Sequence, residues 1–202
     1  MIKNIVFDFG GVLVEWDPHR LYDNYFGNRE KADWFLSNIC TMEWNSQMDA
    51  GKPFSVGVAE LSSLFPEWSA EIHMYRDHWI DMMGNQIPGM EDLIVEFKNK
   101  GYKLFGLTNW SAETFPLVKH RYKIFGHLDG MLVSGYEHMI KPGIGYYKLL
   151  LEKFFLKAEE CLFVDDNQAN VDAAISVGMN AVRFQNAEHL KDFFIATIES
   201  IQ

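Results

Sequence analysis

Cysteine is scarce in this chain of 202 residues, which contains only Cys40 and Cys161. Two cysteines cannot build a disulfide framework, so we expect a reduced protein of the cytoplasm. No apolar run approaches the roughly 20 residues that a membrane-spanning helix needs. The first apolar stretch meets an acid at Asp8, too early for the apolar segment of a signal peptide. The composition therefore predicts neither a membrane span nor a secreted protein.

Basic residues are also few. The chain has 18 lysines and arginines against 28 aspartates and glutamates, for a formal net charge of -10. Binding to a phosphate backbone draws on clustered Lys and Arg, so we do not expect a nucleic-acid partner. The fractions of hydrophobic (48%) and charged (23%) residues are typical of a globular protein, and the length suits one domain with a modest insertion. These numbers leave the oligomeric state open.

Two kinds of pattern divide the chain. Residues 2–9 are β-branched and aromatic and too few for a helix, so they predict a buried strand. From about residue 88 onward, short apolar runs alternate with amphipathic stretches. We expect helices at 90–100, 111–120, 144–155 and 169–177, and strands at 102–107, 130–133, 162–164 and 181–184. This alternation predicts βαβ units and a parallel sheet covered on both faces.

Residues 17–86 have a different character. Aromatic and methionine residues recur there at helical spacing, and no strand pattern is evident. We therefore predict an α/β protein with a three-layer, Rossmann-like core around a parallel sheet, made of residues 1–15 and 88–202. Residues 16–87 would form a small helical insertion after the first strand.

Chemically informative residues follow four predicted strands. They are Asp8, the pair Thr108 and Asn109, Lys141, and the pair Asp165 and Asp166. Open α/β sheets bind ligands at the carboxyl ends of their strands. Clustered carboxylates repel one another unless a cation joins them, and oxygen ligands suit Mg²⁺. Each residue alone has an ordinary explanation, such as a helix N-cap for Asp166 or a solvated position for Lys141. Together they predict one shared site that holds a phosphate.

The chain resembles the haloacid dehalogenase-like hydrolase superfamily over essentially its whole length. Four motifs carry the resemblance: Asp8-Phe9-Gly10-Gly11-Val12-Leu13, Leu107-Thr108-Asn109, Ile140-Lys141-Pro142 and Phe163-Val164-Asp165-Asp166-Asn167. The helical insertion lies where this superfamily has a mobile cap over the active site. The Asp-Asp-Asn motif and the segment from Trp44 to Gly51, with Asp49, are similar to one branch. That branch holds bacterial α-glucose-1-phosphatase and the N-terminal phosphatase domain of soluble epoxide hydrolase.

The resemblance implies a Mg²⁺-dependent phosphatase that acts on a small phosphorylated metabolite, with a sugar phosphate as the expected substrate. Asp8 would be the nucleophile and would form an aspartyl-phosphate. The metal would be held by Asp8, the carbonyl oxygen of Gly10 and Asp166. Asp165 would be either a further ligand or an acceptor behind the ligands.

The resemblance also implies the groups that contact the substrate. The hydroxyl of Thr108, the backbone N–H of Asn109 and the charge of Lys141 would bind the phosphoryl group. Trp16 and Trp110 each follow a motif closely, so either can line the pocket and stack on a sugar, or simply belong to the core.

Gly10 departs from the superfamily pattern. Its phosphatases usually carry a second aspartate here, which protonates the leaving group and then activates water. Such general acid–base catalysis contributes about 10²–10⁴-fold. Three explanations stay open: a leaving group acidic enough to go unprotonated, a stand-in acid such as His19 or a cap residue, or a non-catalytic protein that binds phosphate esters or a partner.

The 2-haloacid dehalogenases of the superfamily also lack the second aspartate, because a halide leaves without a proton. They work without a metal and do not keep a paired acid in the fourth motif. The pair Asp165 and Asp166 therefore favours phosphate over a haloacid.

Overall fold

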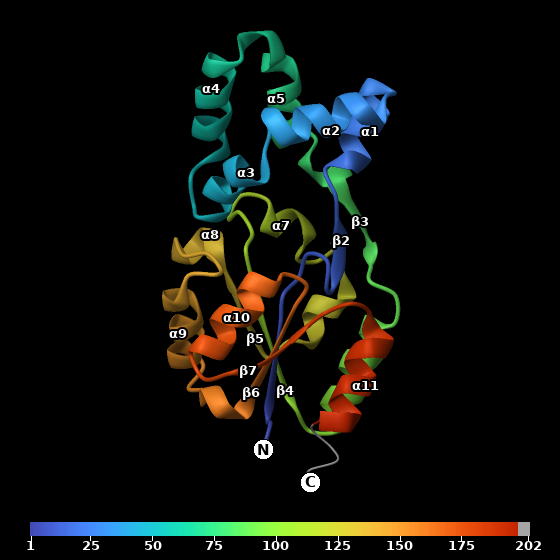
Figure 1. Cartoon of the computed structure of the whole chain (residues 1–202), viewed down its shortest axis with the longest axis vertical. Helices are drawn as coiled ribbons and strands as arrows, with labels where there is room; N and C mark the ends of the chain where they lie inside the picture. Colours follow the sequence, from blue (N-terminus) through green and yellow to red (C-terminus); the bar gives the residue numbers. More distant parts are fainter. Residues whose placement is uncertain (198–202) are drawn as a thin grey trace.

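The computed structural model describes residues 1–197 and is built around a parallel sheet with the strand order β5-β4-β1-β6-β7 (Figure 1). The strands are β1 (Asn4–Phe7), β4 (Lys103–Thr108), β5 (Gly130–Val133), β6 (Cys161–Asp165) and β7 (Asn180–Arg183). Each overlaps a strand expected from the sequence, so the predicted parallel sheet is confirmed. Residues 198–202 of the predicted core lie outside the described residues.

β1 occupies the middle of the sheet because both of its faces are apolar. Val6 pairs in register with Phe105 of β4 and with Phe163 of β6, and it is fully buried. A strand covered on both faces has a continuous run of apolar residues rather than an alternating pattern. The residue that ends this run, Asp8, therefore lies at the carboxyl end of the central strand.

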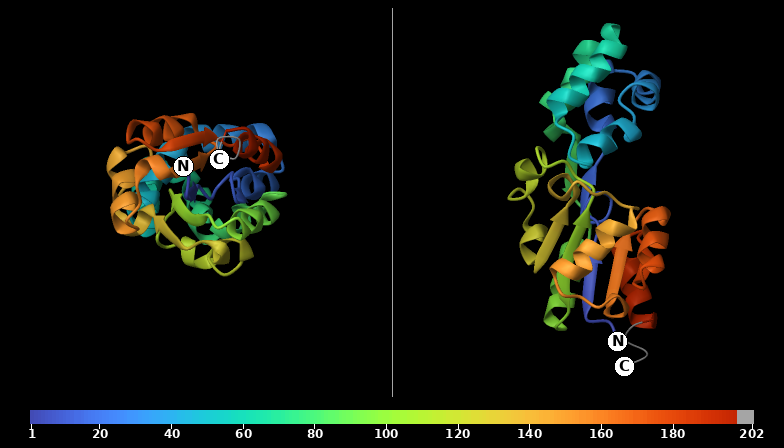
Figure 2. Two further views of the ribbon diagram at one scale, coloured as in Figure 1. Left: turned by 90° about the horizontal axis from the view of Figure 1, so that it is seen from below. Right: turned by 90° about the vertical axis from the view of Figure 1, so that its left-hand side faces the viewer.

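Helices cover both faces of the sheet and give the three layers that were predicted (Figure 2). They are α6 (Met90–Asn99), α9 (Ile144–Lys153), α10 (Gln168–Ser176) and α11 (Ala187–Thr197). α6 and α11 pack in the cluster that contains Ile5 and Phe7 of β1. α9 and α10 pack in the cluster that contains Val6, on the opposite face. Within residues 1–197, no helix has both the length and the apolar character needed to cross a bilayer.

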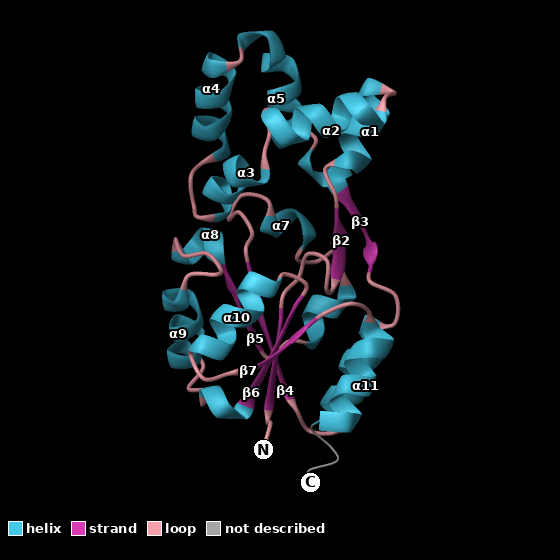
Figure 3. Cartoon of the chain, in the orientation of Figure 1, coloured by secondary structure: helices cyan, strands magenta, loops and turns pink. Residues whose placement is uncertain are grey.

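The insertion is mainly helical and stands beyond the carboxyl ends of the sheet strands (Figures 1 and 3). It contains α1 (His19–Phe26), α2 (Arg29–Asn38), α3 (Met42–Asp49), α4 (Phe54–Leu64) and α5 (Ser69–Asp77), with short 3₁₀ helices η1 (Pro66–Trp68) and η2 (Trp79–Met82). The ring of Tyr22 lies 4.8 Å from that of Phe35 and 6.3 Å from that of Tyr75. Large aromatic side chains thus supply the core that a small helical unit needs.

One prediction for the insertion is wrong, because the range 17–86 contains a strand. β3 (Met83–Gln86) pairs antiparallel with β2 (Val14–Trp16), and this ribbon connects the insertion to the sheet. The sequence of β3 has no β-branched residue, so only its pairing with β2 reveals it. The predicted cap boundaries, 16–87, fall at this ribbon and stay a prediction.

A second prediction, the helix at 111–120, is too long. Only α7 (Phe115–Val118) is helical there, and turns precede it. Proline fits only the first turn of a helix, so Pro116 prevents this helix from starting several residues earlier. The sequence patterns also missed α8 (Ser134–Glu137), the short helices η3 (Lys123–His127) and η4 (Ala158–Glu160), and α11.

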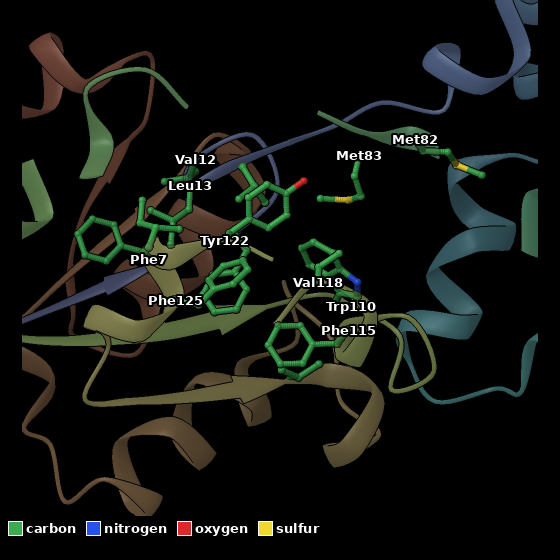
Figure 4. Packing of buried hydrophobic residues seen from close by; sticks show 14 of the residues in the cluster. Phe7, Val12, Leu13, Met82, Met83, Trp110, Phe115, Val118, Tyr122 and Phe125 are labelled. Atoms are coloured by element: carbon green, nitrogen blue, oxygen red, sulfur yellow. The ribbon is translucent and has the colours of Figure 1, made fainter. Parts of the chain in front are cut away.

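One hydrophobic cluster continues from the core into the insertion, and Figure 4 shows the part around the ribbon. The ring of Phe9 lies 4.7 Å from Phe125 and 6.5 Å from Trp110. Trp110 in turn lies 5.6 Å from Trp79, at the end of the insertion. The insertion is therefore packed against the core as well as joined to it by the ribbon.

Candidate active site

A cavity of about 350 Å³ lies at the carboxyl ends of the strands and is lined by core and insertion residues together. Seven of the site residues predicted from the sequence line it: Asp8, Gly10, Trp16, Asn109, Trp110, Lys141 and Asp166. Thr108 and Asp165 do not line it, and both are buried. The fold thus brings residues from four separate motifs to one place.

Lys141 forms a buried bridge between two acids. Its Nζ lies 2.8 Å from Oδ1 of Asp8 and 2.7 Å from Oδ2 of Asp165. Although burial alone would lower the pKa of Lys141, the two carboxylates raise it overall. The lysine therefore stays charged, and it is not a solvated surface residue.

Both carboxylate oxygens of Asp165 accept hydrogen bonds. Besides Lys141, it accepts from the backbone N–H of Asn167 at 2.9 Å and from Nδ2 of Asn170 at 3.0 Å. Sequence reasoning missed Asn170, which lies in the first turn of α10. Asn167, and not Asp166, caps this helix, because its side chain accepts from Ala169 N–H. Asp165 thus acts as an anchor for Lys141.

Asp8 combines burial with a nearby cation. Its carboxylate accepts from the N–H of Phe9 at 2.6 Å, and its backbone N–H donates to the carbonyl oxygen of Val164. Burial raises the pKa of Asp8 to about 7, the charge of Lys141 opposes this rise, and the charge of Asp165 adds to it. A cation bound on the cavity side would favour the charged carboxylate.

The acids fit a divalent cation bound through oxygen. Asp8, Asp165 and Asp166 offer carboxylate oxygens that all lie within 4.8 Å of one another. In residues 1–197, no side chain donates a hydrogen bond to the Asp166 carboxylate, and burial and the charge of Asp165 raise its pKa. The Asp166 carboxylate occupies the space that a side chain at position 11 would fill, because a Cβ on Gly11 would lie 2.5 Å from Oδ2 of Asp166. The φ of Gly11, +75°, also suits glycine.

Thr108 and Asn109 end β4 but differ in accessibility. Thr108 is 1% exposed, and its carbonyl oxygen accepts from the hydroxyl of Tyr146 at 3.1 Å. Asn109 lines the cavity, while its side-chain amide is engaged with the backbone of Lys141. Asn109 therefore fixes the loop that carries the lysine.

Trp16 and Trp110 both lie in the cavity wall. Their buried Nε1 atoms have no hydrogen-bond partner in the part of the chain that the structure describes. From the insertion, Met42 and Trp79 join them. One side of the cavity is therefore largely aromatic and apolar.

His19 lies elsewhere. Its Nδ1 is 3.0 Å from Oδ1 of Asp23 and its Nε2 is 3.2 Å from Oδ1 of Asp33, and it does not line the cavity. This placement gives no support to His19 as a stand-in acid.

Asp49, the last residue of α3, brings a further carboxylate to the cavity from the insertion. Its carboxylate accepts from the N–H of Ser111 and from Nδ2 of Asn45, the latter at 3.0 Å. Burial raises the pKa of Asp49 to about 7, the Ser111 N–H opposes the rise, and the charge of Asp8 adds to it. The sequence patterns alone gave Asp49 no role, because no local pattern links it to the sheet.

Fold and site together define an α/β protein with an acid-lined cavity at the ends of a parallel sheet, beneath inserted helices. The profile of the haloacid dehalogenase-like hydrolases matches residues 2–178. The chain belongs to this family.

Two curated relatives are hydrolytic enzymes of different substrates. A sesquiterpene phosphatase of Aspergillus oryzae is 28% identical over 184 residues, which are 88% of this chain and 87% of that protein. A chloroplastic flavin mononucleotide hydrolase of Arabidopsis thaliana is 24% identical over 104 residues, 52% of this chain and 42% of that protein.

Solved structures share the fold at low identity. A HAD family enzyme of Bacteroides thetaiotaomicron, solved as a magnesium complex, has a TM-score of 0.74 and 20% identity, covering 96% of this chain and 98% of that one. The L-2-haloacid dehalogenase of Xanthobacter autotrophicus, solved with chloropropionic acid covalently bound, has a TM-score of 0.65 and 16% identity, covering 98% of this chain and 84% of that one. These likenesses support the architecture and do not decide between phosphate and haloacid.

Proposed function

We propose that the chain is a phosphatase that hydrolyses a small phosphomonoester through an aspartyl-phosphate on Asp8. The observation that carries the proposal is the position of Asp8 at the end of the central strand, in the cavity, with Nζ of Lys141 at 2.8 Å. An anionic nucleophile can approach an anionic phosphate only where positive charge is held beside both. The relationship to a sesquiterpene phosphatase supports the same class of reaction.

Magnesium is the proposed cofactor, held by Asp8, the carbonyl oxygen of Gly10 and Asp166. This donor set contains only oxygen, which Mg²⁺ prefers. The magnesium complex of a similarly folded enzyme supports the choice. Asp165 would serve as the acceptor that positions Lys141 rather than as a ligand. When bound, the metal neutralises charge on the phosphoryl oxygens.

The reaction would proceed in two displacements. An oxygen of Asp8 attacks phosphorus, the bond to the leaving oxygen breaks, and the electron pair departs with that oxygen. Lys141, the backbone N–H of Asn109 and the hydroxyl of Thr108 hold the phosphoryl group; Thr108 is the least accessible of the three. Water then attacks the aspartyl-phosphate and restores Asp8.

The aromatic wall indicates what the organic part of the substrate contacts. We propose a sugar phosphate, because a sugar ring can stack on the indoles of Trp16 and Trp110 and an anomeric oxygen leaves readily. An apolar alkyl phosphate, such as an isoprenoid monophosphate, is the second candidate. It is favoured by Met42 and Trp79 in the wall and by the sesquiterpene phosphatase relative.

We also propose that residues 16–87 move as a cap on connections near residues 15–17 and 86–89. Attack by Asp8 needs water excluded, whereas hydrolysis of the intermediate needs it admitted. Structures without ligand and with a phosphate analogue should differ in the orientation of this segment; an identical orientation would contradict the proposal.

Phosphate release from p-nitrophenyl phosphate tests the reaction class. We expect release with Mg²⁺, loss of release with EDTA, and no release by Asp8→Asn. Phosphate release in the presence of EDTA, or phosphate release by Asp8→Asn, would contradict the proposal. A panel of glucose 1-phosphate, hexose 6-phosphates and farnesyl monophosphate then separates the two substrate classes.

Two other functions have distinct outcomes. A non-catalytic phosphate- or partner-binding protein, suggested by Gly10, would be stabilised by Mg²⁺ with beryllofluoride yet turn over no ester in a broad panel. A 2-haloacid dehalogenase would release halide without metal, a reading that Asp166 beside Asp8 does not favour.

A further inference from the structure

The first displacement leaves an alcohol oxygen with an extra electron pair, and this oxygen needs a proton unless it is unusually acidic. Gly10 lines the cavity but has no side chain to supply one. A Cβ on Gly10 would meet no heavy atom within 4 Å, so the space above this glycine is open. A proton donor therefore has to reach the leaving group from another element.

Four titratable side chains line the cavity in the described part of the chain: Asp8, Asp49, Lys141 and Asp166. Asp8 is the proposed nucleophile, and Lys141 is held between Asp8 and Asp165. Asp166 belongs to the proposed metal site. Asp49 is the remaining group that can hold and release a proton.

The surroundings of Asp49 favour a carboxyl group that exchanges its proton. Its donors are neutral: the Ser111 N–H and the Asn45 amide. Among the described residues, the groups that shift its pKa include no lysine, arginine or histidine. The ionisable groups that act on it electrostatically are Asp8 from the sheet and Tyr75 from α5. A carboxyl group without a cationic partner and near another anion holds its proton more tightly. Its pKa of about 7 leaves both forms populated near neutral pH.

We propose that Asp49, carried by α3 of the insertion, is the general acid and base of the reaction in which Asp8 is the nucleophile. This inference rests on the proposed phosphatase function. As the bond between phosphorus and the leaving oxygen breaks, the electron pair stays on that oxygen. The proton of the Asp49 carboxyl moves to it, and a neutral alcohol departs.

The second displacement returns the proton. The Asp49 carboxylate takes a proton from water while the water oxygen attacks phosphorus of the aspartyl-phosphate. The bond from phosphorus to the Asp8 oxygen breaks and its electron pair restores the Asp8 carboxylate. Inorganic phosphate leaves, and Asp49 is protonated again.

Asp49 also joins the insertion to the core, since Ser134 Oγ donates to its carbonyl oxygen at 2.5 Å. A purely structural role would affect all substrates alike, whereas a proton donor matters most for a poor leaving group. The variant Asp49→Asn separates the two roles. Its amide oxygen can still accept from the Ser111 N–H, but an amide does not transfer a proton.

The experiment compares 2,4-dinitrophenyl phosphate, whose phenolate needs no proton, with n-butyl phosphate, whose alkoxide does. In rapid-quench single turnovers with Mg²⁺, Asp49→Asn should phosphorylate Asp8 from the dinitrophenyl ester within about 3-fold of the wild-type rate. Cleavage of the butyl ester should fall by about 10²–10⁴-fold. Because the second displacement also slows, the variant should accumulate phosphoenzyme and, with the dinitrophenyl ester in excess over enzyme, should show a burst of dinitrophenolate.

Two control variants distinguish the effect of the contact between insertion and core from the effect of proton transfer. Ser134→Ala removes the hydrogen bond to the Asp49 backbone and should change both esters by the same factor. His19→Gln alters a residue outside the cavity and should change neither. A melting temperature that Mg²⁺ and beryllofluoride raise equally in wild type and Asp49→Asn shows that the variant is folded.

The inference would be overturned if Asp49→Asn lost the same factor of activity on both esters. It would also be overturned if this variant cleaved the butyl ester as fast as the wild type does. If Asp49→Asn does not fold, Asp49→Glu should cleave the butyl ester faster than Asp49→Gln, and equal rates would overturn the inference. A wild-type protein that releases phosphate from neither ester would refute the phosphatase function and this inference together. If the wild type is active and Asp49→Asn slows cleavage of both esters by the same factor, this inference is refuted and the phosphatase function is not.

Discussion

Asn109 and Lys141 hold each other through a pair of hydrogen bonds. Nδ2 of Asn109 donates to the carbonyl oxygen of Lys141 at 2.9 Å, and the N–H of Lys141 donates to Oδ1 of Asn109 at 2.8 Å. The pair joins the loops that follow β4 and β5, which are neighbours in the sheet. It thereby fixes the loop that places the lysine ammonium between Asp8 and Asp165.

Asn109→Ala should lower the free energy of unfolding by about 2 kcal/mol, because each of two lost hydrogen bonds contributes about 1 kcal/mol. The proposed phosphatase activity should fall with it, since Lys141 is less well placed. Urea unfolding and phosphate release measure the two effects. Asn186→Ala, which removes one exposed hydrogen bond to His189 N–H, should cost about 1 kcal/mol and leave activity unchanged. Full activity in Asn109→Ala would show that the pair does not position the lysine.

Lys141→Met should destabilise the protein by about 3–5 kcal/mol, because it leaves Asp8 and Asp165 as buried acids without their cation. Adding Asp165→Asn should recover part of the loss, since one uncompensated charge is then removed. A double-mutant cycle in urea measures the coupling. Purely additive losses would mean that the bridge contributes nothing specific.

Gly11→Ala should remove the response to Mg²⁺, because its Cβ would displace the carboxylate of Asp166. The matched control is Gly27→Ala, where φ is also positive, at +58°, but no atom lies within 4 Å of the added Cβ. Both variants should lose about 1 kcal/mol through backbone strain. Differential scanning fluorimetry with and without Mg²⁺ measures the difference. A metal-induced stabilisation that persists in Gly11→Ala would refute the placement of the metal beside Asp166.

The pKa of Asp49 predicts a pH dependence of stability. Folding raises this pKa from 3.8 to about 7, so the folded protein binds a proton that the unfolded chain releases between these values. Titration of Asp49 therefore lowers the free energy of unfolding of the protein as pH rises from about 4 to about 7. The loss is on the order of 2 kcal/mol after allowing for the partial exposure of this side chain.

Asp49→Asn removes this titration. We expect the variant to be more stable than wild type at pH 8 and nearly equal to it at pH 4, as measured by urea midpoints in metal-free buffer. Asp92→Asn, an exposed position on α6, serves as the control. A stability difference that does not change between pH 4 and pH 8 would show that folding does not shift this pKa.

The sheet and much of the site were predictable from local sequence. Buried parallel strands are continuous apolar runs, and Asp8, Asn109 and Asp166 each follow one directly. The ribbon strand β3 was missed because Met83-Gly84-Asn85-Gln86 lacks the residues that favour strands. The helix predicted at 111–120 is shorter in the structure, because Pro116 fits only the first turn of a helix.

Which side chains of the inserted helices reach the site could not be predicted. Asp49 and Trp79 reach the cavity only because the insertion packs on the core, and no local spacing encodes that contact. The same holds for Thr108, whose place at a strand end was predicted but whose 1% exposure depends on the packing around it.

The central place of β1 has a consequence for synthesis of the chain. The ribosome makes Asn4–Phe7 before either of its neighbours in the sheet, because residues 103–108 and 161–165 lie later in the chain. Until these neighbours have been translated, β1 is an apolar strand whose two edges have no pairing partner, and such segments tend to aggregate. The nascent polypeptide should therefore depend on chaperone protection of β1 until β4 and β6 have emerged.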